Sequence, residues 1–186
     1  MHVLTRPGGE QGLQRCGKLA WLIPMALVGA GIGVARAGEV GIQWGAYHSY
    51  REVLVSYDSD SLWTREFGGR RLDIGFEASV GRVTAPSGTS HHELWHLGAS
   101  PVLRYWLTPR TGIEYLLGGH LFSGVRLGDK NISTAFQFGD SIGLMHRFGT
   151  GPWALGVRVT HYSNADLKLP NPGQNYLQLR ATYAFK

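Results

Sequence analysis

Apolar and polar residues alternate with a period of two along most of the chain after residue 40. The last segment shows this most clearly, because its apolar side chains occupy every second position up to Phe185. Strand residues point to opposite faces in turn, so this period predicts strands with one apolar and one polar face. A long turn is expected at 59–69. The predicted strands lie at 40–48, 51–58, 70–82, 93–107, 111–122, 134–148, 152–162 and 174–186.

Two features of these segments separate a membrane barrel from a soluble sandwich, which also alternates. The predicted strands reach about 10 to 15 residues, whereas strands of globular proteins most often have 5 or 6. Their polar faces also carry charged residues, namely Glu52, Arg71, Asp73, Glu77, Arg104, Glu114, Arg158 and Arg180. A small membrane barrel places such charges in its lumen, where opposite signs can pair, and its aromatic residues near the lipid headgroups.

Aromatic residues lie near the ends of the predicted strands, as expected for girdles at the two membrane surfaces. These residues are Tyr105, Trp106, Trp153, Tyr162, Tyr183 and Phe185. The sequence therefore predicts an all-β fold, an eight-stranded antiparallel transmembrane β-barrel in the outer membrane of a Gram-negative bacterium.

The first 37 residues differ from the rest of the chain. A basic region is followed by an apolar run over 19–34 and a small-x-small sequence at 35–37, which predicts a cleaved signal peptide and a barrel of residues 38–186. Much of the net charge of +5 falls in this first segment, so no basic patch remains and nucleic acid is not an expected partner. The single cysteine, Cys16, also lies here, so the mature chain has no thiol chemistry.

The strongest candidate for chemistry is the sequence His161-Tyr162-Ser163-Asn164-Ala165. The period of two places His161 and Ser163 on the same face as the preceding apolar residues, which is the predicted lipid face. Residues two apart on a strand lie about 6 to 7 Å apart at Cα, close enough for an imidazole to accept a proton from a serine hydroxyl. Ordinary polar residues among the headgroups would show the same spacing, so the spacing alone does not decide.

This motif, with Leu167-Lys168 and Pro170-Asn171, resembles the signature of the PagL-type lipid A 3-O-deacylases. Enzymes of this family lie in the outer membrane and remove an ester-linked acyl chain from the lipid A of lipopolysaccharide. The resemblance implies that His161 is the general base and Ser163 the nucleophile. It also implies an active site that faces lipopolysaccharide in the outer leaflet. Further similar segments lie at 56–58, 99–102, 123–131 and 138–143.

The third catalytic residue of the family is a glutamate twelve residues after the serine, and here that position is Asn175. An amide can orient the imidazole but carries no charge. Asp140 is a candidate supporting acid, because a hairpin over 148–153 would place it opposite His161, about 5 Å away at Cβ. Asp166, in the loop after the motif, is a weaker candidate.

Asn164, Asn171 and backbone N–H groups near Ala165 can donate to the oxyanion of a tetrahedral intermediate. They can equally serve only to stabilise the loop, and both interpretations stay open. The other histidines show no zinc-ligand spacing, and His96 and His120 are expected to face the lumen, so neither a zinc site nor a cofactor is expected. No other metal is predicted, although loop acids such as Asp129 leave calcium open.

The missing glutamate favours one alternative, a non-catalytic outer-membrane barrel with an adhesion or envelope-structural role. The longest predicted outer loop has only about eleven residues, whereas an adhesin usually carries long, charged loops, and this difference favours the enzyme. The sequence leaves the oligomeric state open, a homodimer included.

Overall fold

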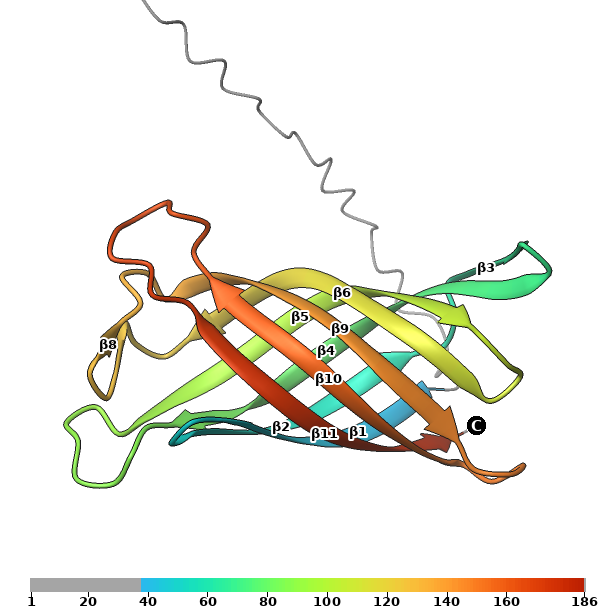
Figure 1. Cartoon of the computed structure of the whole chain (residues 1–186), viewed down its shortest axis with the longest axis horizontal. Helices are drawn as coiled ribbons and strands as arrows, with labels where there is room; N and C mark the ends of the chain where they lie inside the picture. The colour runs from blue at the N-terminus through green and yellow to red at the C-terminus, as the bar shows by residue number, and fades with distance from the viewer. Residues whose placement is uncertain (1–37, 186) are drawn as a thin grey trace, which may run out of the picture. The chain divides into compact units, whose positions relative to one another are not determined.

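The computed structural model describes residues 38–185, so the predicted signal peptide lies outside the described residues. The described part is built almost entirely from strands (Figure 1). No helix within it is long and apolar enough to cross a membrane. The strands are β1 (Gly38–Tyr47), β2 (Tyr50–Ser59), β3 (Trp63–Phe67), β4 (Arg70–Thr84), β5 (Glu93–Trp106), β6 (Thr111–Phe122), β7 (Arg126–Leu127), β8 (Lys130–Asn131), β9 (Phe136–Arg147), β10 (Trp153–Ser163) and β11 (Gln174–Phe185).

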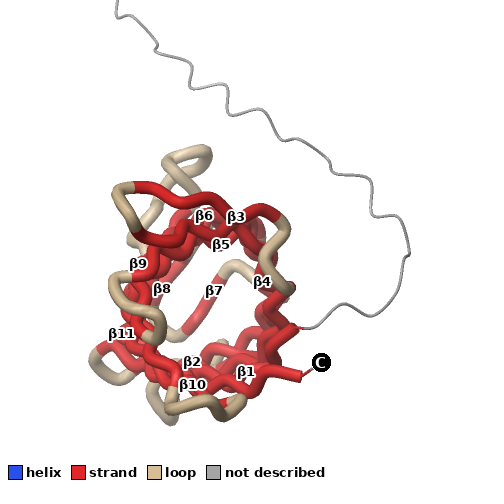
Figure 2. Tube along the Cα trace, turned by 90° about the vertical axis from the view of Figure 1, so that its right-hand side faces the viewer, coloured by secondary structure: helices blue, strands red, loops and turns tan. Residues whose placement is uncertain are grey.

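Nine of these strands form one antiparallel sheet, in the order β2-β1-β11-β10-β9-β6-β5-β4-β3. β2 also pairs with β4, so eight strands close into a barrel and only β3 stays outside the closure. The closed ring is visible end-on in Figure 2. The predicted eight-stranded antiparallel barrel is confirmed, and the observed bounds of its strands differ from the predicted ones by two residues at most.

The expected long turn at 59–69 was wrong, because this segment contains β3. β3 pairs with the first part of β4, and the resulting hairpin extends past the end of the barrel where β1 begins and β11 ends (Figure 1). All five side chains of β3 are exposed. Since neither face of β3 is buried, its sequence carries no regular alternation that would mark it as a strand.

The barrel is apolar outside and polar inside, as the alternation predicted. On β10, Leu155 and Val159 are exposed, whereas Arg158 between them is buried. The guanidinium of Arg158 lies in the lumen, 3.0 Å from a carboxylate oxygen of Glu77 and 3.2 Å from one of Glu114. Charges buried in this way need partners of the opposite sign, and the lumen supplies them.

Two of the aromatic residues predicted for the girdles lie in the lumen instead. Trp106 and Tyr162 are only 4% and 2% exposed. Each occupies an inward position of its strand, where its polar atom finds a partner: Trp106 Nε1 donates to Asp73 and the Tyr162 hydroxyl to Glu52. Trp153 is exposed on the outside, as expected. Nearness to a strand end was therefore a weaker guide than the period of two.

A hairpin closes the barrel at the end opposite to β3. The loop between β6 and β9 carries β7 and β8, which pair with each other, and β7 lies across the opening in the end-on view (Figure 2). Leu127 and Ile132 of this loop are buried in one apolar cluster with Tyr162 and Tyr176 of the barrel wall. The hairpin therefore seals the lumen directly beside the end of β10.

Candidate active site

His161 and Ser163 lie at the end of β10, on its outward face. Both are partly exposed and share that face with Val159. β10 is paired on both sides, and the residues opposite His161 are Asp140 on β9 and Asn175 on β11. The predicted register across the β9–β10 hairpin is confirmed, and three candidate side chains project outward from neighbouring strands.

The ring of His161 is held by Asn175. Its Nδ1 lies 2.7 Å from the Asn175 amide oxygen. Because that oxygen can only accept, the hydrogen must be on Nδ1, and Nε2 is left free to take a proton. Ser163 lies two residues further along the same strand face, on the outside of the barrel.

Gly173 packs against the same ring. It has a left-handed backbone with φ of 64°, and a Cβ added to it would lie 2.7 Å from Cε1 of His161. Only glycine fits both the conformation and the contact. This contact was not predicted from the sequence, although Pro-Asn-Pro-Gly is a turn signature. A turn signature does not say what the turn packs against.

Neither acid considered from the sequence touches His161. Asp140 is exposed and directly opposite, but no hydrogen bond or ion pair within residues 38–185 engages its carboxylate. Asp166 accepts a hydrogen bond from Asn171 Nδ2 at 3.0 Å. Asn175 is therefore the group that holds the imidazole in this structure.

A tight turn follows Ser163 directly. Leu167 N–H donates to the Asn164 carbonyl at 3.0 Å, and Ala165 and Asp166 between them have φ of 52° and 59°. Two successive positive φ values define a type I′ turn. Such values are uncommon for residues other than glycine and cost energy, and they cluster at functional sites. The Ala165 N–H has no hydrogen-bond acceptor within the described part of the chain, so it can donate to a ligand.

The side chain of Asn164 stabilises the loop. It is fully buried, and its Nδ2 lies 3.3 Å from the Ile132 carbonyl and 2.7 Å from that of Lys168. Its backbone N–H donates to the Asn171 side-chain oxygen at 3.2 Å. Of the two interpretations left open for Asn164, this geometry favours loop stabilisation. The hydrogen bond of Asn171 Nδ2 goes to the exposed Asp166, so this amide group is free to turn toward a ligand.

A second group of histidine and serine side chains lies inside the lumen. His96 Nε2 is 2.8 Å from His120 Nδ1, and His120 Nε2 is 3.4 Å from the Ser100 hydroxyl. All three residues are buried, at 1%, 8% and 3% exposure, as the predicted lumenal position of the histidines requires. A lipid ester outside the barrel wall cannot reach this hydroxyl, so the outward pair is the better candidate.

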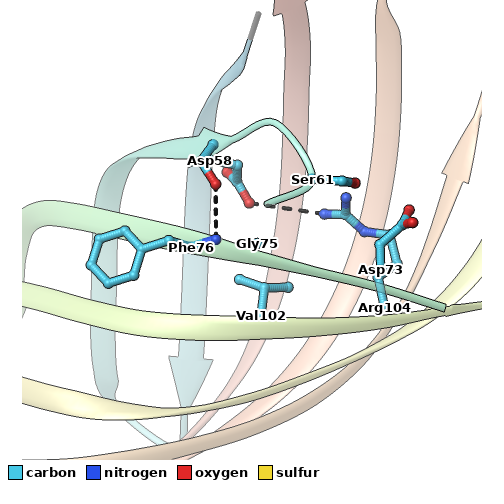
Figure 3. Close-up of a pocket in the computed structure, with 8 residues that line it drawn as sticks. Asp58, Ser61, Asp73, Gly75, Phe76, Val102 and Arg104 are labelled. Carbon is cyan, nitrogen blue, oxygen red and sulfur yellow. Dashed lines mark hydrogen bonds and ion pairs between the residues drawn. The ribbon is translucent and has the colours of Figure 1, made fainter. Parts of the chain in front are cut away.

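Neither of two cavities in the described part is lined by His161 or Ser163. The larger one, with a volume of about 250 Å³, is lined by Gly69, Arg70, Arg71, Trp106, Thr108 and Pro109. The cavity in Figure 3 lies where β2 gives way to β3, between Asp58, Gly75, Val102 and Arg104. Its volume is about 10 Å³, room for about one water molecule. Within residues 38–185, no three His, Cys, Asp or Glu side chains are grouped to hold a metal ion.

Comparison with known proteins adds the family to this geometry. The model of a family described as lipid A 3-O-deacylase (PagL) matches residues 40–184. The chain belongs to this family. It is 38% identical over 150 residues to the lipid A deacylase PagL of Bordetella bronchiseptica, covering 80% of this chain and 84% of that protein. For PagL of Pseudomonas aeruginosa the identity is 34% over 166 residues, with 82% and 91% covered.

Solved structures agree on the architecture. The crystal structure of the outer-membrane enzyme PagL superposes with a TM-score of 0.69 at 28% identity, covering 78% of this chain and 98% of that chain. The outer-membrane protein Ail of Yersinia pestis gives a TM-score of 0.51 at 11% identity, covering 81% of this chain and all of that one. The latter likeness concerns the fold alone. The PagL family member described here is an outer-membrane β-barrel.

Proposed function

We propose that the protein is a lipid A 3-O-deacylase, a serine esterase that hydrolyses the 3-O-linked acyl chain of lipid A in lipopolysaccharide. The observation that carries this proposal is the His161–Asn175 hydrogen bond beside Ser163, on the outward face of a barrel of the PagL family. A soluble hydrolase would need a pocket for the acyl chain. Here the chain reaches the serine laterally, from within the outer leaflet.

Ser163 is the proposed nucleophile. Its oxygen attacks the ester carbonyl while Nε2 of His161 takes the hydroxyl proton. Collapse of the tetrahedral intermediate breaks the bond to the sugar oxygen, which leaves as a hydroxyl with the proton from the imidazolium. Water then gives a proton to His161 and attacks the acyl-serine, which releases the fatty acid and restores the enzyme.

Asn175 is the proposed orienting residue. Its amide oxygen fixes the tautomer that leaves Nε2 free, as the asparagine of papain-like enzymes does for their histidine. It does not supply the charge that a glutamate would. Asp140, opposite His161 on β9, is the candidate for electrostatic support from a distance.

The oxyanion of the tetrahedral intermediate needs hydrogen-bond donors that have no other strong acceptor in the protein. Ala165 N–H and Asn171 Nδ2 are the proposed pair, since Asn164 is engaged with loop carbonyls. Asn171 would exchange its exposed partner Asp166 for the oxyanion. Donors aimed at the developing charge each contribute about 10²- to 10³-fold to the rate in related chemistry.

Purified protein incubated with lipid A in detergent tests the proposal by mass spectrometry. We expect the lipid to lose one acyl chain from the 3-position and an equal amount of free fatty acid to appear. Unchanged lipid A, or loss of a chain from another position, would refute the proposed reaction.

Two further points rest on sequence alone. We propose that residues 1–37 are a signal peptide, and sequencing of the N-terminus of the mature protein should begin at Gly38. A homodimer stays a prediction, which light scattering of the protein in detergent tests.

A further inference from the structure

A lysine of the β7–β8 hairpin reaches across the barrel opening to the loop that carries the proposed site. Lys130 Nζ lies 3.4 Å from the carbonyl oxygen of Gly173. It also lies over two aromatic rings from the turn between β1 and β2, at 4.7 Å from the ring centre of Tyr50 and 5.9 Å from that of Tyr47. A distant segment of the chain thereby places a cation beside β11.

This ammonium group has few partners for its charge. No carboxylate oxygen within residues 38–185 comes within 4.0 Å of Lys130 Nζ, and the neighbouring Asp129 accepts a hydrogen bond from Tyr50 instead. One carbonyl oxygen serves a group with three donors. Lys130 is half-buried, so part of the water that would otherwise solvate the ammonium is excluded.

Asp129 and Lys130 are neighbouring groups of opposite charge on the hairpin, and the surroundings of each shift its pKa. Partial burial lowers the pKa of Lys130, and the nearby negative charge of Asp129 counteracts that effect. The hydrogen bond from Tyr50 lowers the pKa of Asp129. Because the Asp129 carboxylate is directed to Tyr50, the Lys130 ammonium is left accessible to an incoming anion.

Lys130 is connected to the proposed active site through Gly173. Gly173, whose carbonyl it contacts, packs directly on the imidazole of His161. A ligand bound at this ammonium therefore lies beside the reacting ester rather than at a remote surface. Lipid A is an acylated glucosamine disaccharide that carries phosphate groups, so its headgroup supplies an anion close to its esters.

We propose that Lys130 binds a phosphate group of the lipid A headgroup while the 3-O-ester lies against Ser163. This inference rests on the proposed function and adds a recognition element to it. The ammonium fixes the sugar relative to the serine, and the tyrosine rings hold the lysine in place by cation–π contact. Lys130 would act on substrate binding and leave the chemical step to β10 and β11.

The test compares lipid A that carries its phosphates with the same lipid A after removal of the phosphates. Wild type should cleave the phosphorylated substrate with a KM about tenfold lower, the effect of roughly 1.4 kcal/mol of binding. Lys130→Met should lose this preference, with KM raised for the phosphorylated substrate only and kcat unchanged. Lys130→Arg should keep most of the preference.

Arg126→Met is the matched control, because Arg126 is an exposed cation on the same hairpin and makes no hydrogen bond to Gly173. It should keep the preference. Equal losses for Lys130→Met on both substrates would overturn the proposal in favour of a purely structural tie to Gly173. The proposal would also be overturned if wild type cleaved both substrates with the same KM. Inhibition by added inorganic phosphate would not rescue it, because it would show only that Lys130 binds free phosphate.

The outcomes separate this inference from the proposed function. If wild type cleaves neither substrate, the deacylase proposal fails. If it cleaves both equally well, the deacylase proposal stands and phosphate recognition by Lys130 fails. Retained heat-modifiable migration on a gel shows that each variant still forms the barrel.

Discussion

Nδ1 of His161 donates to the side-chain oxygen of Asn175 across the β10–β11 pair, at 2.7 Å. The resemblance to the PagL-type enzymes implies a glutamate at the position of Asn175. The geometry of an acid–histidine pair is therefore present without its charge. In a chymotrypsin-type triad, an amide in place of the acid lowers turnover about 10⁴-fold because the histidine takes the wrong tautomer. Here the amide oxygen faces the ring, and the tautomer is the useful one.

Substitutions of Asn175 separate orientation from charge. Asn175→Leu removes the acceptor and should lower kcat/KM by about 10²-fold, within the range that general base catalysis contributes. Asn175→Glu keeps the acceptor and adds a charge that stabilises the imidazolium, so a rise of about tenfold is expected, equivalent to roughly 1.4 kcal/mol. Initial rates of fatty acid release from lipid A in detergent measure both changes.

Asp140→Asn tests whether Asp140, rather than Asn175, is the third catalytic residue. Asp140 faces His161 without a hydrogen bond, so its loss should change kcat/KM by less than about tenfold. If Asp140→Asn is more damaging than Asn175→Leu, the acid on β9 is the third member, and the assignment to Asn175 is wrong.

Gly173→Ala should impair the site through direct contact with the imidazole. The new methyl group would lie 2.7 Å from His161 Cε1, so the ring must move away from Asn175. Gly149→Ala is a matched control, because Gly149 also has a positive φ, 54°, but nothing within 4 Å of an added Cβ. Both changes cost about 1 to 2 kcal/mol of backbone strain. Only Gly173→Ala should lower kcat, by about tenfold or more, and equal kcat values in the two variants would contradict the contact.

The lumenal charge network should govern barrel stability. Arg158→Met leaves Glu77 and Glu114 without one of their partners, and breaking a buried pair from one side costs about 3 to 5 kcal/mol. Arg82→Met breaks an exposed pair with Glu93 and should cost about 1 kcal/mol or less. Urea unfolding in detergent, followed by tryptophan fluorescence, compares the two. Similar losses of unfolding free energy would show that the network contributes little.

The sequence predicted the barrel because the outward and inward faces of long strands differ in chemistry at every second residue. The same period placed His161 and Asn175 on the outward face, and the short turn after β9 predicted the register that brings Asp140 opposite His161. The pairing of Asn175 with His161 was seen only in the structure. Segments without that period were not predicted. β3 is exposed on both faces, and the β7–β8 hairpin is too short to show a pattern.

Contacts between segments far apart in the chain could not be predicted from the sequence either. The approach of Lys130 to Gly173 joins residues 43 positions apart in the chain, and no local pattern encodes it. The choice between Asn175 and Asp140 also needed side-chain geometry, since both lie opposite His161 in the ladder. The loop role of Asn164 depends in the same way on carbonyl groups of Ile132 and Lys168.

The outward Ser163, rather than the lumenal Ser100, is the proposed nucleophile. The most direct measurement is the mass spectrum of lipid A from cells that produce wild type, Ser163→Ala or Ser100→Ala in equal amounts in the outer membrane. We predict that lipid A lacks its 3-O-acyl chain with wild type and with Ser100→Ala, and keeps the chain with Ser163→Ala. Deacylated lipid A in the Ser163→Ala cells, with intact lipid A in the Ser100→Ala cells, would contradict the account.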